Sequence, residues 1–179
     1  MQIISASEAA KFVCDGDTVL ISGSGGGHAV PDALLAALEA RFLEQGAPRG
    51  ITSMSIVGVG DRAALGASHL AHKGLLRRAI TSALVDSPAL VTMAAADEIE
   101  AYTLPQGVMS QLMREMAAGR PGLITKTGLH TFVDPRQQGA AKSAHAARLH
   151  RSTHARRRAI SAFQAAAAER HLRARHHRR

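Results

Sequence analysis

Glycines gather in one short stretch near the start of the chain. Ser22-Gly23-Ser24-Gly25-Gly26-Gly27-His28 directly follows the apolar run Thr18 to Ile21. Glycine lets backbone N–H groups approach an anion or a thioester, and a following helix would add its positive end. A Rossmann fingerprint would need glycine at position 28, and a Walker A loop would need Gly-Lys-Ser/Thr, so neither nucleotide motif fits. Two interpretations stay open: a binding loop formed by Gly25, Gly26 and Gly27, or close packing of a strand against a helix.

Five other side chains belong to types that take part in catalysis or metal binding. His28 could donate a hydrogen bond to a carboxylate substrate, or neighbouring backbone could satisfy it. His69 and His72 are three residues apart, but no carboxylate or cysteine accompanies them at a recognised metal-ligand spacing, so we expect a structural role. Glu98 and Glu100 lie at the start of an expected strand, where we expect solvated charges.

Several blocks of sequence resemble the family I CoA-transferases. The first is Asp15-Gly16-x-x-Val19-Leu20-Ile21-Ser22-Gly23 with the glycines up to Pro31-Asp32, although Ser22-Gly23-Ser24 stands where the family has Gly-Gly-Phe. The stretch to Pro31 is also one residue longer than in the succinyl-CoA:3-ketoacid branch. More specific blocks are His69-Leu70-Ala71-His72-Lys73-Gly74-Leu75, Ile99-Glu100-Ala101-Tyr102-x-Leu104-Pro105-Gln106-Gly107-Val108, Ala118-Gly119-Arg120-Pro121-Gly122-Leu123-Ile124-Thr125-Lys126-x-Gly128, and Thr131-Phe132-Val133-Asp134-Pro135-Arg136. They are most similar to the single-chain acetate or propionate CoA-transferases (acyl-CoA:acetate/3-ketoacid CoA-transferases).

The resemblance implies an enzyme that moves CoA from an acyl-CoA to a carboxylic acid acceptor, such as acetate or a short-chain or 3-keto acid. The family does this through a glutamyl-CoA intermediate on its own glutamate. Gln106 matches the glutamine of the family's Pro-Gln-Gly motif, which implies a donor to the oxyanion. Backbone N–H groups of Gly25, Gly26 and Gly27, with His28, would line the same pocket. The resemblance implies no metal and no cofactor, since coenzyme A is itself the substrate.

The family's catalytic glutamate lies in a C-terminal half whose motif matches nothing in these 179 residues. We therefore expect the isolated chain to be inactive. Another chain, or a second copy in a homo-oligomer, would have to supply that half.

Strands and helices are expected to alternate through the first 139 residues. We expect helices opened by Ser5 and Glu8, from Pro31 to Gly46, near 69–77, near 87–96 and at 107–118, and strands at 18–21, 51–59, 79–85, 99–104 and 123–126. Short connections favour an α/β fold of three layers, α/β/α, with a mostly parallel sheet resembling that of the CoA-transferases. The carboxyl ends of its strands would then bring the glycine-rich stretch and Gln106 together. Cys14 is expected to be a small buried residue.

Charge divides the chain into two parts. Residues 1–139, the expected N-terminal part of a CoA-transferase α-type domain, have a net charge of −2, whereas residues 140–179 have a net charge of +10. This basic tail contains 13 alanines among its 40 residues and only four large apolar ones. We expect it to be disordered, and we interpret its composition as translation of GC-rich DNA in another reading frame. One cysteine, no long apolar run and no secretory signal favour a cytoplasmic protein without a membrane partner.

Two other functions would each use one part of the sequence. A basic tail could bind nucleic acid through phosphates, but it has one aromatic residue, Phe163, for base stacking, and the rest of the chain has no excess of basic residues. A sugar-phosphate isomerase or deaminase of related fold would use the glycine-rich stretch for phosphate. The Pro-Gln-Gly block argues against that alternative.

Overall fold

The computed structural model describes residues 3–23, 29–144, 150–155 and 158–163. The chain forms two compact units, which are described separately. The first unit comprises Met1–Thr103 and Lys142–Ala146, and the second comprises Leu104–Ala141 and Ala147–Arg179. The chain thus leaves the first unit after β4 and returns to it for a few residues near position 142.

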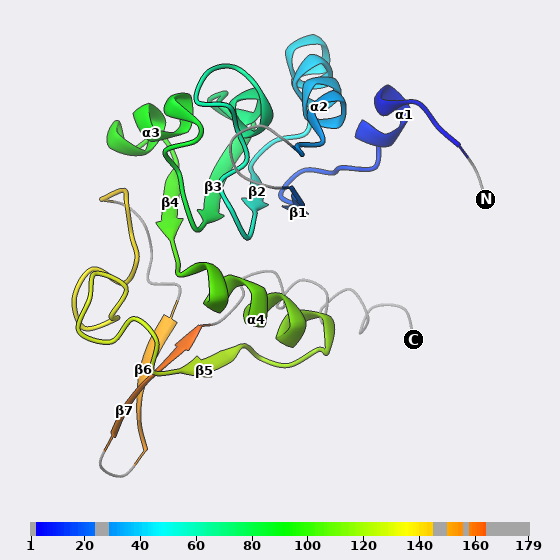
Figure 1. Cartoon of the computed structure of the whole chain (residues 1–179). Helices are drawn as coiled ribbons and strands as arrows, with labels where there is room; N and C mark the ends of the chain where they lie inside the picture. Colours follow the sequence, from blue (N-terminus) through cyan, green and yellow to red (C-terminus); the bar gives the residue numbers. More distant parts are fainter. Residues whose placement is uncertain (1–2, 24–28, 145–149, 156–157, 164–179) are drawn as a thin grey trace. The chain divides into compact units, whose positions relative to one another are not determined.

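A four-stranded parallel sheet forms the centre of the first unit (Figure 1). Its strands are β1 (Thr18–Leu20), β2 (Ile51–Met54), β3 (Leu76–Thr81) and β4 (Glu100–Thr103), and they lie side by side in the order of the sequence. The connecting helices are α2 (Asp32–Gln45), the 3-10 helix η1 (Gly66–Leu70) and α3 (Pro88–Ala95), with α1 (Ala6–Ala10) before them. This arrangement confirms the α/β class and the parallel sheet.

The hydrophobic core of the first unit lies between the sheet and its connecting helices. Right-handed connections between sequential parallel strands place their helices on the same face of a sheet. Accordingly, one buried cluster joins residues of α2, η1 and α3 to residues of the strands: Leu35, Leu38, Ala67, Leu70, Leu90, Met93, Ile51, Leu76, Ala79 and Ala101. Burial of this cluster holds the three helices against the sheet.

Local sequence signals set several element boundaries. The capping box at α1 is formed as expected, with the Glu8 N–H donating to Ser5 Oγ (3.2 Å) and the Ser5 N–H donating to Glu8 Oε2 (2.8 Å). Helix α2 ends at Gly46, which adopts the left-handed conformation (φ 68°) and donates its N–H to the Phe42 carbonyl. Both boundaries follow from residues that are three or four positions apart in the sequence.

Three expectations about local structure were wrong. The helix expected near 69–77 is the short η1, and β3 already begins at Leu76; Gly74, which has a positive φ, lies between these two elements. The strand expected to reach Val59 ends at Met54. Cys14 is exposed because it lies in the turn between α1 and β1.

The continuous apolar sequence of strand β1 is typical of a strand that is covered on both faces. Its residues Thr18 and Leu20 are exposed, since β1 lies at the edge of the four-stranded sheet. The hydrophobic run alone therefore overstated its burial.

The opposite edge of the sheet, β4, is lined by residues from the returning segment 142–144. The Lys142 N–H donates to the Ala101 carbonyl (2.7 Å), and the Ala101 N–H donates to Ser143 Oγ (3.1 Å). The Ala144 N–H also donates to Asp97 Oδ1 (2.5 Å). The two bonds to Ala101 satisfy backbone groups that an edge strand would otherwise present to solvent.

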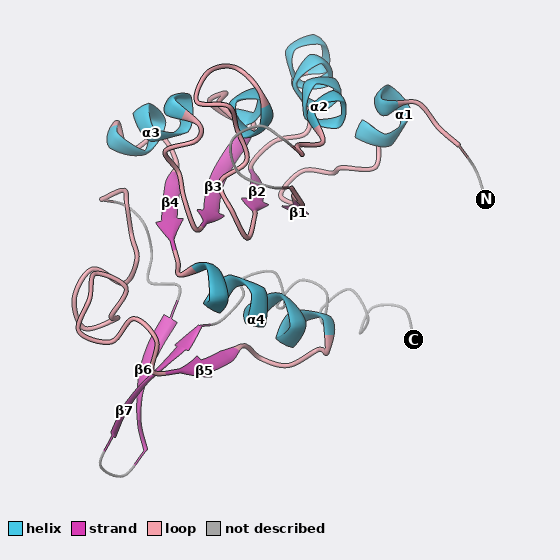
Figure 2. Ribbon diagram, in the orientation of Figure 1, coloured by secondary structure: helices cyan, strands magenta, loops and turns pink. Residues whose placement is uncertain are grey.

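The second unit contains α4 (Gln106–Ala117) and a three-stranded antiparallel sheet in the order β5-β7-β6 (Figure 2). Its strands are β5 (Leu123–Thr125), β6 (His150–Ala155) and β7 (Arg158–Phe163). Helix α4 corresponds to the helix expected at 107–118, and it buries Val108, Met109 and Leu112 on one face. Strand β5 does not belong to the parallel sheet, because it pairs with β7.

The segment expected to be disordered, 140–179, therefore includes two strands in this structure. Strands β6 and β7 pair in antiparallel fashion from His150↔Phe163 to Ala155↔Arg158. The disorder expected for the segment stays a prediction about the protein in solution. In the described ranges, no helix has the length and apolar character needed to cross a membrane.

Candidate functional site

The loops that follow β2 and β3 interlock at the carboxyl edge of the first unit's sheet, where ligands bind in open α/β sheets. A Cβ atom at Gly58 would lie 2.2 Å from Asp86 Oδ2 and 2.8 Å from the Ala83 carbonyl oxygen. A Cβ at Gly60 would lie 2.1 Å from the Asp86 carbonyl oxygen. These distances leave no room for a side chain, so the two glycines permit the close contact of the loops.

Hydroxyl groups lie beneath these loops, around a small cavity. Ser55 Oγ donates to Thr81 Oγ1 (3.0 Å), which in turn donates to the Val57 carbonyl (3.1 Å). Ser68 Oγ and Ser87 Oγ are 3.0 Å apart. The cavity, of about 20 Å³, is lined by these hydroxyl-bearing residues except Ser68, together with Ser53 and the apolar Ile21, Val59, Ala67, Ala79, Ala83, Leu84 and Leu90. That volume suits a single water molecule.

Asp61 and Asp86 hold the backbone of the loop between β2 and η1. Asp61 Oδ1 accepts hydrogen bonds from the Ala63 N–H (2.9 Å) and the Leu65 N–H (3.0 Å), and these bonds lower the pKa of the Asp61 carboxyl. The Arg62 N–H donates to the Asp86 carbonyl (3.0 Å), and the Arg62 guanidinium is 3.4 Å from Asp86 Oδ1. The loop between β2 and η1 is therefore held by its own residue Asp61 and by Asp86, which belongs to the loop after β3.

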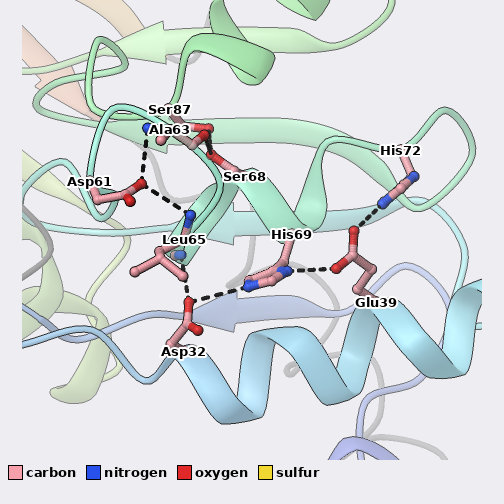
Figure 3. A network of polar contacts seen from close by, with 10 residues as sticks. Asp32, Glu39, Asp61, Ala63, Leu65, Ser68, His69, His72 and Ser87 are labelled. Carbon is pink, nitrogen blue, oxygen red and sulfur yellow. Dashed lines mark hydrogen bonds and ion pairs between the residues drawn. The ribbon is translucent and has the colours of Figure 1, made fainter.

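One carboxylate, Glu39 on α2, contacts both histidines that the sequence singles out (Figure 3). Glu39 Oε2 is 2.5 Å from His69 Nδ1, and Glu39 Oε1 is 2.5 Å from His72 Nε2. Desolvation raises the pKa of Glu39, but the bonds from His72 and His69 outweigh it and leave that pKa below its usual value. In the part of the chain that the structure describes, no three His, Cys, Asp or Glu residues are placed to hold a metal ion.

Asp32, the first residue of α2, lies on the other side of His69. Its Oδ1 accepts a hydrogen bond from the Gly66 N–H (2.8 Å) and is 3.2 Å from His69 Nε2. The distance between Asp32 Oδ1 and His69 Nε2 is that of an ion pair, but the two atoms are not aligned for a hydrogen bond. His69 Nε2 therefore has no hydrogen-bond partner. Through these contacts His69 and His72 join η1 and the residues just after it to α2, which is a structural role of the kind expected for them.

The residues expected to bind substrate are only partly described. Gly25, Gly26, Gly27 and His28 lie outside the described residues. Gln106 is exposed and is the first residue of α4, preceded by Pro105 as N-cap, in the second unit. A pocket shared by Gln106 and the glycines therefore stays a prediction.

The expectation of a solvated charge was wrong for Glu100. Arg78 Nη2 is 2.6 Å from Glu100 Oε2, and Arg77 Nη1 is 3.5 Å from Oε1. The Tyr102 hydroxyl donates to the same carboxylate (3.3 Å); burial, followed by the charge of Glu100, raises the pKa of Tyr102. Glu98 is more exposed, and its nearest ion-pair partner is Lys73 at 3.9 Å.

Sequence reasoning missed Asp32, Glu39 and the glycines at 58 and 60 as organising residues. Asp32 and Glu39 are two helical turns apart on α2, and His69 and His72 are three residues apart, so matching spacings of acids and histidines were the available signal. Nothing in one sequence says that the two pairs meet. The run Val57-Gly58-Val59-Gly60 contains two further glycines, which could have indicated a close contact between loops.

Comparison with known proteins gives relatives of one kind. One is the acetate CoA-transferase YdiF of Escherichia coli K12, which is 40% identical over 137 residues, and another is the caffeate CoA-transferase of Acetobacterium woodii, 40% identical over 139 residues. These matches cover 76% and 77% of this chain but 26% of each relative. The chain thus spans about a quarter of the length of these two curated relatives.

Solved structures show the same likeness. The acyl-CoA transferase YdiF of E. coli O157:H7, in a thioester complex with CoA, superimposes with a TM-score of 0.86 at 35% identity, over 90% of this chain and 32% of that one. Glutaconate coenzyme A-transferase of Acidaminococcus fermentans, at 15% identity and a TM-score of 0.63, shares the fold over 92% of this chain and 53% of its own. The sequence profile of the family described as coenzyme A transferase matches residues 3–161. The chain belongs to the coenzyme A transferase family.

Proposed function

We propose that this chain contributes the acyl-CoA-binding part of a CoA-transferase that moves CoA from an acyl-CoA to acetate or another short-chain or 3-keto acid. The observation that carries the proposal is the likeness to YdiF, whose solved structure is a thioester complex with CoA. Sequence and fold agree over the same region, since the identity to the acetate CoA-transferase of E. coli covers 76% of this chain. The loops after β2 and β3 also support the proposal, because they lie at the carboxyl edge of a parallel sheet, where open α/β proteins bind their ligands.

In this proposal, Gln106 is the side chain that stabilises the reaction's oxyanion. Attack of a glutamate on the thioester forms a tetrahedral intermediate, in which negative charge grows on the former carbonyl oxygen. A neutral amide at the start of a helix can donate a hydrogen bond there without needing to change its charge. Exposure of Gln106 at the first position of α4 leaves its amide accessible to a substrate. Backbone N–H groups of Gly25, Gly26 and Gly27 complete the oxyanion site, and His28 contacts the carboxylate acceptor.

None of the residues that we assign to the substrate site is the nucleophilic glutamate. Glu100 is committed to Arg77 and Arg78, and Glu98 lies beside Lys73. A carboxylate held by two guanidinium groups is a poor nucleophile, because attack would remove the charge that those groups stabilise. We therefore propose that the 179-residue polypeptide binds acyl-CoA but does not transfer CoA without the remaining part of the enzyme.

The first experiment separates binding from turnover. Calorimetry with acetyl-CoA tests binding, and incubation with acetyl-CoA and propionate, followed by chromatography of the CoA esters, tests transfer. We expect binding without propionyl-CoA. Borohydride reduction should trap no glutamyl-CoA thioester. A trapped adduct on Glu98 or Glu100 would contradict the assignment, and failure of acetyl-CoA to bind would contradict the proposed function itself.

The second experiment tests Gln106 in an assembled enzyme. The chain would be combined with a polypeptide carrying the remaining part of E. coli YdiF, and the rate of propionyl-CoA formation measured. Gln106→Ala should lower kcat by about 10² to 10³, the usual effect of one lost oxyanion donor, with little change in KM. Gln111→Ala is the matched control, because Gln111 is also an exposed residue of α4. Equal effects of the two substitutions would contradict the role of Gln106.

A further inference from the structure

The two edges of the four-stranded sheet differ in how they are covered. At β4, the Lys142 N–H and the Ser143 hydroxyl bond to the backbone of Ala101. At the opposite edge (Figure 1), Thr18 and Leu20 of β1 are exposed, and 57% of Leu20 is accessible to solvent. The protein thus covers one edge of its sheet with its own residues and leaves the other edge in contact with solvent.

The backbone of β1 has hydrogen-bonding groups on the side away from β2. The Ile21 N–H donates to the Met54 carbonyl (2.8 Å), so Ile21 directs its backbone groups towards β2. In a parallel sheet, successive residues of a strand direct these groups alternately to its two sides. Thr18 and Leu20 therefore direct their N–H and C=O groups towards the open edge, where another strand could pair with them.

The side chain of Leu20 belongs to an apolar row that crosses the sheet. The strand register places Leu20 beside Met54, Met54 beside Ile80, and Ile80 beside Tyr102. The other three side chains of the row are buried, with exposed fractions of 7% or less. Only the end of the row at β1 is exposed to solvent. A further strand beside β1 would lengthen the row and bury Leu20, which is favourable because apolar surface leaves water.

The sequence of β1 is that of an interior strand. Thr18-Val19-Leu20-Ile21 is a continuous apolar run, which is typical of parallel strands with neighbours around them. Edge strands are usually protected by lysine, proline or an inward-pointing charge, and β1 contains none of these residues. Its length of three residues is its one protection against unspecific pairing. The edge of β1 therefore fits a specific partner strand better than permanent exposure.

The family relationship indicates where such a strand comes from. Because the matches cover 26% of E. coli YdiF and of the caffeate CoA-transferase, most of each relative lies outside them and can supply further strands. A second copy of this chain fits less well, since it would offer only another three-residue edge. Stable interfaces bury about 800 Å² on each partner, which two such edges do not reach.

We propose that the open edge of β1 is the docking site for a β-strand from the part of a CoA-transferase that lies outside the matched region. Its backbone pairs with Thr18 and Leu20, and an apolar side chain of the incoming strand covers Leu20. Strand addition of this kind takes affinity from main-chain hydrogen bonds and specificity from the side chains. The inference rests on the proposed function for the identity of the partner, namely the remaining part of the enzyme, but docking itself needs no acyl-CoA.

Two variants of the 179-residue protein test this surface. Leu20→Lys places a charge on β1, and lysine on an edge strand opposes pairing. Leu43→Lys is the matched control, because Leu43 is also an exposed leucine of the first unit (65%) but lies on α2. Each protein is mixed with a polypeptide that carries the remaining part of E. coli YdiF. Gel filtration with light scattering measures the complex, and NMR measures amide exchange at Thr18 and Leu20.

We expect a one-to-one complex in which amide exchange at Thr18 and Leu20 slows at least about tenfold, since pairing protects these N–H groups. Leu20→Lys should weaken the complex by about tenfold or more, whereas Leu43→Lys should leave it unchanged. Equal effects of the two substitutions, with unchanged exchange at Thr18 and Leu20, would overturn the docking site. A wild-type dimer that Leu20→Lys abolishes would also overturn it, because a second copy would then be the occupant.

A chimera decides the question if the separate YdiF polypeptide does not fold. In the chimera, the matched region of this chain replaces that of YdiF in a single polypeptide. Leu20→Lys should lower its Tm by several degrees more than Leu43→Lys does, although the two substitutions have similar small effects in the 179-residue protein. Equal losses in the chimera would overturn the proposal. Failure of the 179-residue protein to bind acetyl-CoA, with the complex intact, would overturn the proposed function alone.

Discussion

Asp134 and Arg136 form a two-bonded ion pair within a single turn of the second unit. Arg136 Nε donates to Asp134 Oδ1 (2.9 Å) and Arg136 Nη2 to Oδ2 (2.5 Å), while the Asp134 side chain is 1% exposed. The same carboxylate accepts the N–H groups of His130 (2.9 Å) and Arg136 (3.0 Å). The arginine side chain is the largest influence that holds the pKa of Asp134 well below its usual value, followed by the His130 N–H.

Replacement of Asp134 by asparagine should therefore lower thermal stability by several degrees at neutral pH. A depressed carboxyl pKa contributes stability above the unfolded-state pKa, about 3.9, and the contribution is lost as pH falls towards the folded-state value. The difference in Tm between wild type and Asp134→Asn should shrink in strong acid. Glu115→Gln is the control, because the Glu115–Arg120 pair lies in the same unit but Arg120 is 65% exposed. Equal losses for both substitutions would contradict this account.

Glu39→Gln should weaken the attachment of α2 to η1. A glutamine has one acceptor oxygen, so it cannot accept from both His69 and His72, and we expect a loss of about 1 to 2 kcal/mol in the free energy of unfolding at pH 7. The pKa of Glu39 is lowered in the folded protein, so its contribution is present above about pH 4.3 and declines as pH falls below that value. Urea unfolding at pH 7 and pH 3.5 measures this. A loss that grows towards acid pH would contradict the prediction.

Gly60→Ala should destabilise the first unit strongly, by more than about 2 kcal/mol. The added Cβ would lie 2.1 Å from the Asp86 carbonyl oxygen, and backbone cannot move aside as a flexible side chain can. Gly107→Ala provides the matched control, because a Cβ there meets nothing within 4 Å and Gly107 lies inside α4. Alanine should raise stability there by roughly 0.5 to 1 kcal/mol. Thermal unfolding of both variants separates a steric effect from a general effect of replacing glycine.

Glu98 and Glu100 should differ sharply when each is replaced by alanine. Glu100→Ala leaves Arg78, which is 11% exposed, without its closest carboxylate, and should cost about 2 to 3 kcal/mol. Glu98→Ala should cost less than about 0.5 kcal/mol, since Lys73 is 83% exposed. Equilibrium unfolding in urea gives both values. A similar cost for the two would mean that the Arg78–Glu100 pair contributes no more than a surface charge.

Signals between near neighbours in sequence predicted much of the fold. The Ser5–Glu8 capping box, the Gly46 helix end and the spacing of apolar residues in α4 each depend on residues within a few positions of one another. The α/β alternation followed from them. The 3-10 helix η1 was missed because it is short and because tertiary contacts, such as the Asp32–Gly66 bond, decide where it begins.

The candidate site was less predictable for the same reason. Asp32 and Glu39 reach His69 from 37 and 30 positions away, and no local pattern links them. Strands β6 and β7 were missed because alanine and arginine are not strand-forming residues by composition, whereas pairing with β5 depends on distant partners. The resemblance to CoA-transferases identified Gln106, which no physical pattern would have distinguished from an ordinary residue at a helix start.

The returning segment at positions 142–144 matters for anyone who shortens this protein. Composition suggests cutting the chain after residue 139, where the basic segment begins. Such a cut would remove the Lys142 N–H and the Ser143 hydroxyl from Ala101 and expose the rim of β4. Exposed edge strands pair readily with strands of other molecules. A polypeptide ending at 139 should therefore self-associate and precipitate, whereas one ending at 144 should remain dispersed.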